Sequence, residues 1–88
     1  MSWAYSFAEA ARKEFLKLDR QAQKQILRYF DSRIAGSGDP RRFGKPLRGD
    51  LAGVWRYRVG DYRVLCKIRD TEFVVLVISV GHRKNVYD

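Results

Sequence analysis

The 88-residue chain is poor in the residues that build disulfides, metal centres and membrane spans. Its single cysteine, Cys66, excludes an internal disulfide, and one cysteine with one histidine, His82, cannot form a zinc-type cluster. No apolar run approaches the ~20 residues of a membrane-spanning helix, and the N-terminus lacks the apolar core of a signal peptide. We therefore expect a cytoplasmic protein that uses no cofactor, no metal and no membrane.

The chain has an excess of positive charge. Eighteen lysines and arginines against ten acidic residues give a net charge of +8. Hydrophobic residues make up 45%, as in folded proteins, and the length fits one small domain spanning residues 1–88. The charge favours nucleic acid over a membrane surface as partner, because no segment combines an apolar helix face with a lysine-rich one.

The N-terminal part predicts one short strand and two helices. Residues 3–7 can form the strand, and Ser6 with Glu9 matches a capping box that would begin the first helix. Asp19 can cap a second helix that ends near Gly36. Each helix has an apolar stripe that requires a partner surface. The stripes are Ala8, Ala11, Phe15 and Leu18, then Ala22, Ile26, Tyr29 or Phe30, and Ile34.

Residues 36–49 are punctuated by glycine and proline and predict an irregular loop. The loop contains four basic residues: Arg41, Arg42, Lys45 and Arg48. Two interpretations stay open, a solvated linker and a loop that contacts a phosphate backbone.

Two alternating segments, residues 54–59 and 62–69, predict a β-hairpin. Gly60 and Asp61 between them can form a two-residue turn. Residues 73–80 are apolar on both faces and predict a central strand, and Cys66 falls on the inner face as a small core residue. The order strand, helix, helix, strand, strand, strand predicts a single-domain α+β fold, with an N-terminal helical hairpin packed on a mainly antiparallel four-stranded sheet.

The predicted turn places Arg58 opposite Arg63, with Arg56 on the same face. Opposed like charges destabilise a sheet by up to ~1 kcal/mol. The cluster therefore indicates a polyanionic ligand, because planar guanidinium groups bind phosphate by two hydrogen bonds. The alternative is a row of solvated arginines whose stems cover the sheet. Arg69, which a second hairpin would place opposite Glu72, fits that alternative better.

Three segments resemble the RelE branch of the RelE/ParE toxin superfamily: LKLD, KPLRGDLAGVWRYRVGDYRVLCKI and VISVGHRKNVY. The resemblance covers nearly the whole chain. It implies a curved antiparallel sheet with two N-terminal helices, and a small basic toxin of a type II toxin–antitoxin pair. Such toxins enter the ribosomal A site and cleave messenger RNA, so the expected activity is a ribosome-dependent, metal-independent endoribonuclease that halts translation.

The site of this family combines basic residues on neighbouring strands with an arginine and a tyrosine near the C-terminus. The resemblance therefore implies a catalytic set of Arg56, Arg58, Arg63, Arg83 and Tyr87. The arginines would hold the phosphate and stabilise its transition state. Tyr87 would accept the proton of the ribose 2′-OH, with stacking on a base or packing on the sheet as its alternative role.

Two departures from the family pattern matter. Some members carry lysines at the positions of Arg56 and Arg58, and arginine cannot exchange a proton as lysine can. His82 could take over proton transfer, but we assign it a minor role at most, because its position suggests a solvated turn residue. The chain also stops one residue after Tyr87, so we expect no helix over the site and little activity on free RNA.

The resemblance also implies partners. An acidic, partly disordered antitoxin of the RelB type would cover the arginines, and operator DNA would be bound only through the antitoxin complex. The ribosome and messenger RNA would be further contacted by basic residues of the loop and the tail. These expected contacts are Arg41, Arg42, Lys45, Arg48 and Lys84.

Other functions stay open. The ParE branch shares the fold but inhibits DNA gyrase and lacks the basic site. A non-catalytic module that binds nucleic acid, or only its antitoxin, would suit the same charge and aromatic content.

Overall fold

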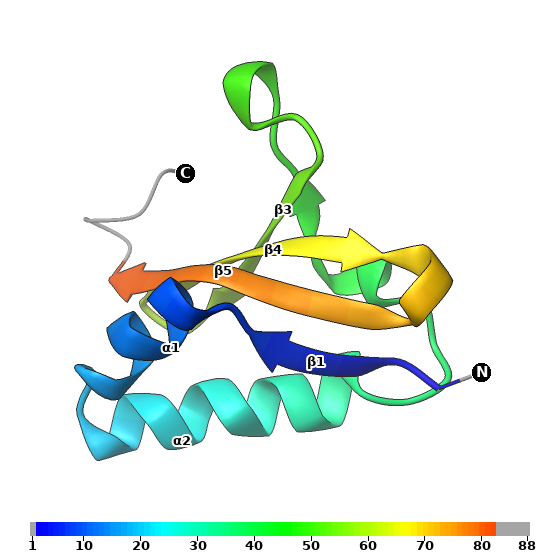
Figure 1. Cartoon of the computed structure of the whole chain (residues 1–88). Helices are drawn as coiled ribbons and strands as arrows, with labels where there is room; N and C mark the ends of the chain where they lie inside the picture. Colours follow the sequence, from blue (N-terminus) through cyan, green and yellow to red (C-terminus); the bar gives the residue numbers. More distant parts are fainter. Residues whose placement is uncertain (1, 83–88) are drawn as a thin grey trace.

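The structure, a computed structural model, describes residues 2–82. They form a five-stranded sheet with two helices on one side (Figure 1). The strands are β1 (Ala4–Phe7), β2 (Lys45–Pro46), β3 (Val54–Val59), β4 (Tyr62–Arg69) and β5 (Val74–His82), and the helices are α1 (Glu9–Leu16) and α2 (Arg20–Tyr29). The strand order is β1-β5-β4-β3-β2, in which β1 is parallel to β5 and the other pairs are antiparallel. The predicted α+β fold is confirmed.

The first helix begins later than the sequence predicts. Ser6 does not cap it, because Ser6 lies in β1 opposite Leu76. The chain stays extended through Ala8, whose N–H donates to the carbonyl of Val77 at 2.9 Å, and α1 starts at Glu9 without a side-chain cap. The predicted capping box is therefore wrong: pairing with a distant strand overrides the local signal.

The second helix is capped as predicted. The Asp19 carboxylate accepts a hydrogen bond from the Ala22 N–H at 2.8 Å, the bond that an N-cap side chain makes. A π-helical turn, Phe30–Ile34, continues α2 toward Gly36, where φ is 123°. Gly36 pairs with Trp3, so the end of the helical hairpin is tied to the start of β1.

The core lies between the helices and the inner face of the sheet. Its buried residues include Ala11, Phe15, Ile26, Phe30, Ile34, Tyr57, Val59, Val64, Cys66, Val75, Val77 and Val80. The predicted helix stripes thus pack on the sheet, and the fully buried Cys66 has its predicted core position.

The predicted turn between β3 and β4 is confirmed. Val59 pairs with Tyr62 and Arg58 with Arg63, and Gly60 has a φ of 59°, a conformation that glycine adopts without strain. This register fixes which side chains share each face of the sheet.

The connection between β4 and β5 differs from the predicted hairpin. Residues Asp70–Glu72 form a 3₁₀ turn and Phe73 takes a left-handed conformation. Arg69 therefore pairs with Val74, and its predicted position opposite Glu72 is wrong.

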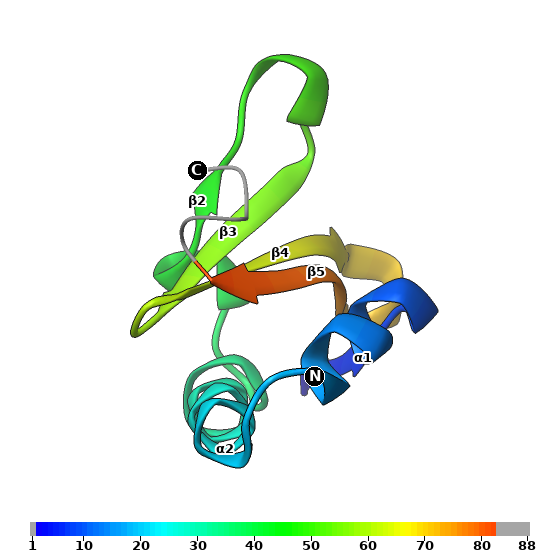
Figure 2. The same cartoon turned by 90° about the vertical axis from the view of Figure 1, so that its left-hand side faces the viewer.

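The sheet is strongly bent. β2 and β3 rise away from β4 and β5 as an arm, residues 45–59, which makes the outer face of the sheet concave (Figure 2). A register shift at Leu65 and Cys66 marks a bulge between β4 and β5, and bulges increase strand twist and bending.

The fifth strand, β2, was not predicted, because two residues in a glycine- and proline-rich segment are too few to show a periodic pattern. Within residues 2–82, no helix is long and apolar enough to cross a membrane.

Candidate functional site

The outer face of β3 and β4 carries three arginines, which we call the arginine face: Arg56, Arg58 and Arg63. Arg56 and Arg58 lie two residues apart on β3, and Arg63 lies directly opposite Arg58 on β4. Residues two apart on a strand point to the same side. The sheet therefore brings the three predicted strand arginines together, as the predicted register required.

Arg63 is the one buried charged side chain within residues 2–82, with an exposed fraction of 6%. Its Nη1 donates to the carbonyl of Tyr62 at 3.4 Å. Its register partner on β5 is Gly81, which has no side chain. A buried guanidinium group loses hydration, and the surrounding protein holds its positive charge in a fixed place.

A small hollow borders the arginine face where β2 meets β3. It has a volume of about 110 Å³ and is lined by Phe43, Lys45, Arg56 and Arg58. Lys45 pairs with Arg56 in the β2–β3 register, so β2 adds a fourth cation beside the cluster. Among the expected RNA contacts, Lys45 is thus brought to the arginine face.

Arg41 has a protein partner. Its Nη2 donates to both carboxylate oxygens of Asp70 at 2.8 and 2.7 Å, and its guanidinium group lies 5.8 Å from the centre of the Trp55 ring. The hydrogen bond to Asp70 raises the pKa of Arg41. The pair ties the 3₁₀ turn Pro40–Phe43 to the β4–β5 connection, and RNA contact by Arg41 stays a prediction.

The remaining predicted contacts are spread over different parts of the chain. Arg42 is exposed, and its Nε donates to the carbonyl of Asp39 at 3.3 Å. Arg48 is exposed in the arm, just before the 3₁₀ turn Gly49–Leu51. Three predicted site residues lie outside the described residues, so their roles stay predictions. They are Arg83, Lys84 and Tyr87.

His82 is the last residue of β5 and not the turn residue that the sequence suggested. It pairs with Tyr62, and the two rings contact edge to face with centroids 5.8 Å apart. Because side chains alternate along β4, Tyr62 and its partner lie on the opposite face of the sheet from Arg63. Within residues 2–82, no group of three His, Cys, Asp or Glu side chains could hold a metal ion.

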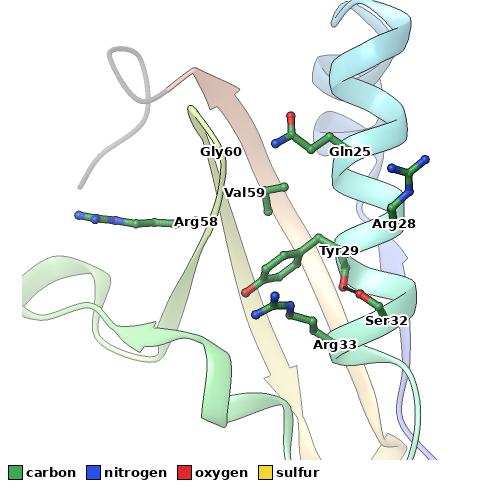
Figure 3. Close-up of a pocket in the computed structure, with 8 residues that line it drawn as sticks. All are labelled: Gln25, Arg28, Tyr29, Ser32, Arg33, Arg58, Val59 and Gly60. Atoms are coloured by element: carbon green, nitrogen blue, oxygen red, sulfur yellow. Dashed lines mark hydrogen bonds between the residues drawn. The ribbon is translucent and has the colours of Figure 1, made fainter.

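A larger hollow of about 430 Å³ lies between α2 and the β3–β4 hairpin, lined by Tyr29, Arg33, Arg58 and Val59 among others. In Figure 3, Val59 points toward α2, whereas the side chain of Arg58 extends to the other side of β3. Arg58 lies at the edge between the two hollows: it borders this one, and it also lines the small hollow of the arginine face.

Helix α2 carries three exposed cations that were not among the predicted site residues. Arg20, Lys24 and Arg28 are exposed four residues apart and share one side of the helix. Like charges at this spacing destabilise a helix, and Arg20 opposes the helix dipole in a first turn without acidic residues. An anionic partner would relieve this unfavourable pattern.

A family model described as "ParE toxin of type II toxin-antitoxin system, parDE" matches residues 5–87. Toxin RelG of Mycobacterium tuberculosis is 33% identical over 87 residues, which cover 99% of this chain and 98% of the relative. In the toxin–antitoxin complex RelBE2 of M. tuberculosis, the matched chain has a TM-score of 0.84 at 32% identity, covering 94% of this chain and 100% of that one. The intact E. coli RelBE toxin–antitoxin complex gives a TM-score of 0.73 at 29% identity, covering 91% and 95%.

The matches in sequence and in structure extend over nearly the whole chain and agree with one another. Two of the similar structures are complexes of a toxin with its antitoxin. The chain therefore belongs to the RelE/ParE superfamily, as a RelE-family toxin of type II toxin–antitoxin systems.

Proposed function

We propose that this toxin is a ribosome-dependent endoribonuclease that cleaves messenger RNA in the ribosomal A site and so halts translation. The observation that supports it is the buried Arg63 directly opposite the exposed Arg58, with Arg56 and Lys45 beside them. A concave face with this charge suits a bent phosphate backbone. The similarity to RelE-type toxins supports RNA as the polyanion.

The reaction is a transesterification within the RNA strand. The ribose 2′-oxygen forms a bond to the adjacent phosphorus, and the bond from phosphorus to the 5′-oxygen of the next nucleotide breaks. The products are a 2′,3′-cyclic phosphate and a 5′-hydroxyl group. One proton must leave the 2′-OH, one must reach the 5′-oxygen, and the charge that grows on the phosphoryl oxygens must be stabilised.

The arginine face meets the electrostatic requirement. In the proposed mechanism Arg63 holds the scissile or adjacent phosphate, and Arg56 and Arg58 stabilise the pentacoordinate transition state. A well-placed fixed donor of this kind is worth about 2.7–4 kcal/mol. Because the sheet fixes the strand positions that carry these arginines, little reorganisation of the backbone is needed at the moment of reaction.

The proton transfers require other groups, because guanidinium hardly gives up a proton. We assign the base to Tyr87 and the leaving-group side to Arg83. Tyr57 is unsuited as a base: its hydroxyl donates to the carbonyl of Pro40 at 2.8 Å, and burial raises its pKa.

We further propose that a RelB-type antitoxin silences the toxin by covering the arginine face. Relatives solved as toxin–antitoxin complexes support a proteinaceous partner. A net charge of +8 favours an acidic segment that folds on binding. Operator DNA would then be bound through the antitoxin part of the complex.

The decisive experiment adds the purified toxin to ribosomes that translate a defined message and maps 5′ ends by primer extension. Cuts within the A-site codon are expected, with none when ribosomes are omitted. Arg58→Gln should reduce these cuts by about 10²- to 10³-fold, whereas Arg69→Gln, which removes an exposed charge further along β4, should not. A message that stays uncut although every ribosome has toxin bound would overturn the proposal.

A second candidate function is inhibition of DNA gyrase. The family model that matches this chain is named after the ParE toxin, and the ParE branch inhibits gyrase. The two functions separate cleanly in parallel assays of translation and DNA supercoiling. We expect normal supercoiling with cleaved message, and the reverse result would select the gyrase function. A non-catalytic binding module would bind RNA or antitoxin and leave both processes running.

A further inference from the structure

Two aromatic rings and two guanidinium groups alternate beside the arginine face. The guanidinium carbon of Arg33 lies 5.4 Å from the centre of the Tyr29 ring and 5.7 Å from that of the Phe43 ring. The guanidinium carbon of Arg42 lies 5.2 Å from the centre of the same Phe43 ring. We call these four side chains the stacking ladder. Tyr29 ends α2, Arg33 lies in the π-helical turn, and the other two lie in the 3₁₀ turn Pro40–Phe43.

The stacking ladder contributes to two hollows, the small one at the arginine face and the larger one between α2 and the β3–β4 hairpin. Phe43 lines the small hollow together with Lys45, Arg56 and Arg58. Tyr29 and Arg33 line the larger hollow, which Arg58 also borders. A phosphate held by the arginine face would therefore have its neighbouring nucleotide within reach of Phe43, the member of the ladder that lines the small hollow.

Phe43 is unusually exposed for a large apolar side chain. Its exposed fraction is 36%, and within residues 2–82 the only other large hydrophobic side chain with at least this exposure is Leu16. The other phenylalanines contribute to the core or pack against it. A partly exposed aromatic ring flanked by two guanidinium groups offers a stacked surface for a flat ligand.

The turn that carries Phe43 is anchored from below. The hydroxyl of the buried Tyr57 donates to the carbonyl of Pro40 at 2.8 Å, and Asp39 accepts from the Arg41 N–H at 3.0 Å. The ring of Tyr57 lies so close to Gly44 that a Cβ there would meet it at 3.0 Å. These contacts hold the turn that carries Phe43 in place. The entropic cost of ordering this turn when a ligand binds is therefore small.

We propose that the stacking ladder is a nucleobase-binding subsite, in which Phe43 and its flanking guanidinium groups stack on the unpaired base next to the phosphate at the arginine face. This inference rests on the proposed function for the nature of the substrate. Aromatic rings and arginine planes stack on bases of any sequence. Purines present the larger ring system, so the subsite favours a purine at that position.

The test uses a single-stranded RNA oligonucleotide that contains 2-aminopurine and is 2′-O-methylated throughout, so that no 2′-OH is present to attack. Stacking of 2-aminopurine on the protein should quench its fluorescence. Phe43→Leu should abolish the quenching and weaken binding about 5- to 150-fold, the usual effect of losing one aromatic stacking partner. Phe43→Trp should retain both.

Two controls separate stacking from general effects. Leu16→Ala removes the other large exposed hydrophobic side chain of residues 2–82 and should leave quenching and affinity unchanged. Phe43→Leu should also leave the salt dependence of binding unchanged, whereas Arg58→Gln should reduce its logarithmic slope by about 0.7, the value for one lost phosphate contact on a single strand. Unchanged thermal unfolding of Phe43→Leu confirms that it folds.

The outcomes distinguish this inference from the proposed function. If the toxin leaves translating message uncut but quenches the probe through Phe43, the nuclease proposal fails and the subsite stands. If the toxin cleaves message while Phe43→Leu changes neither quenching nor the distribution of cut positions, the subsite is overturned. Equal loss of affinity for polyglutamate and for the oligonucleotide in Phe43→Leu would also overturn it, since an acidic peptide offers no base to stack.

Discussion

Arg58 and Arg63 are direct partners in the β3–β4 strand pair, yet the Arg58 side chain is exposed whereas Arg63 has an exposed fraction of only 6%. Two positive charges in this relation repel each other, and one of them is also deprived of water. A folded chain tolerates such a pair at a cost in stability, which an anionic ligand would offset.

Arg58→Gln should therefore make the protein more stable and less active. Loss of the repulsion raises the free energy of unfolding by up to ~1 kcal/mol, and loss of a transition-state donor lowers cleavage on ribosomes by about 10²- to 10³-fold. Urea unfolding and single-turnover cleavage measure the two effects. Arg69→Gln, opposite the apolar Val74, is the matched control and should alter neither strongly. Destabilisation by Arg58→Gln would contradict this account.

Glu14 should stabilise β5 beyond the point where β1 ends. β1 pairs with β5 only as far as Val77, and the Glu14 Oε1 accepts a hydrogen bond from the N–H of the buried Val80 at 2.9 Å. Glu14→Ala leaves that N–H without its acceptor and should cost about 1–3 kcal/mol of unfolding free energy. Glu14→Gln keeps an oxygen there and should cost less, so equal urea midpoints for the two variants would contradict the interpretation.

Tyr57→Phe should destabilise the protein and loosen the turn that carries Phe43. The change removes the donor to the buried Pro40 carbonyl, at a cost of about 1–3 kcal/mol. Tyr29→Phe is the control, because its hydroxyl makes only a 3.5 Å contact to the Phe43 carbonyl. Thermal unfolding of both variants checks the difference, and a similar loss in each would show that the Tyr57 bond has no special weight.

Stability should fall at alkaline pH because tyrosines are held in the neutral form. Burial, then the hydrogen bond to Asp31 at 2.6 Å and the negative charge of that carboxylate, raises the pKa of Tyr5 to about 12. Burial also raises the pKa of Tyr57. The unfolded chain ionises first, near pH 10, so this stability is complete below pH 10 and is lost as pH rises toward 12.

Melting temperatures between pH 9 and 12 test this dependence. Tyr5→Phe and Tyr57→Phe should each flatten the decline, because phenylalanine cannot ionise. A decline of unchanged steepness in both variants would assign it to other groups.

The sequence revealed most where the chemistry is local. Gly60 and Asp61 determine the β3–β4 register, and with it the meeting of Arg58 and Arg63, because a two-residue turn leaves no freedom in pairing. The role of Asp19 as the N-cap of α2 could also be predicted, because the N-cap hydrogen bond joins residues only three positions apart.

The failures come from contacts between distant parts of the chain. Ser6 has a capping signal, but its pairing with Leu76 keeps it in a strand. Arg33 and Phe43 meet only because the 3₁₀ turn is fixed on Tyr57 and Asp70, which no pattern within residues 36–49 reveals. At Ser6, tertiary packing overrides the local preference. At Arg33 and Phe43, tertiary packing acts where the sequence has no local signal.

Cys66 has a practical consequence. It is the one thiol of the chain, lies fully buried on β4, and has a pKa raised by burial. A thiol-reactive dye can therefore label the toxin only when the central strands separate. The native sequence thus contains its own reporter of spontaneous opening, and the labelling rate with and without antitoxin would measure how strongly the complex protects the fold.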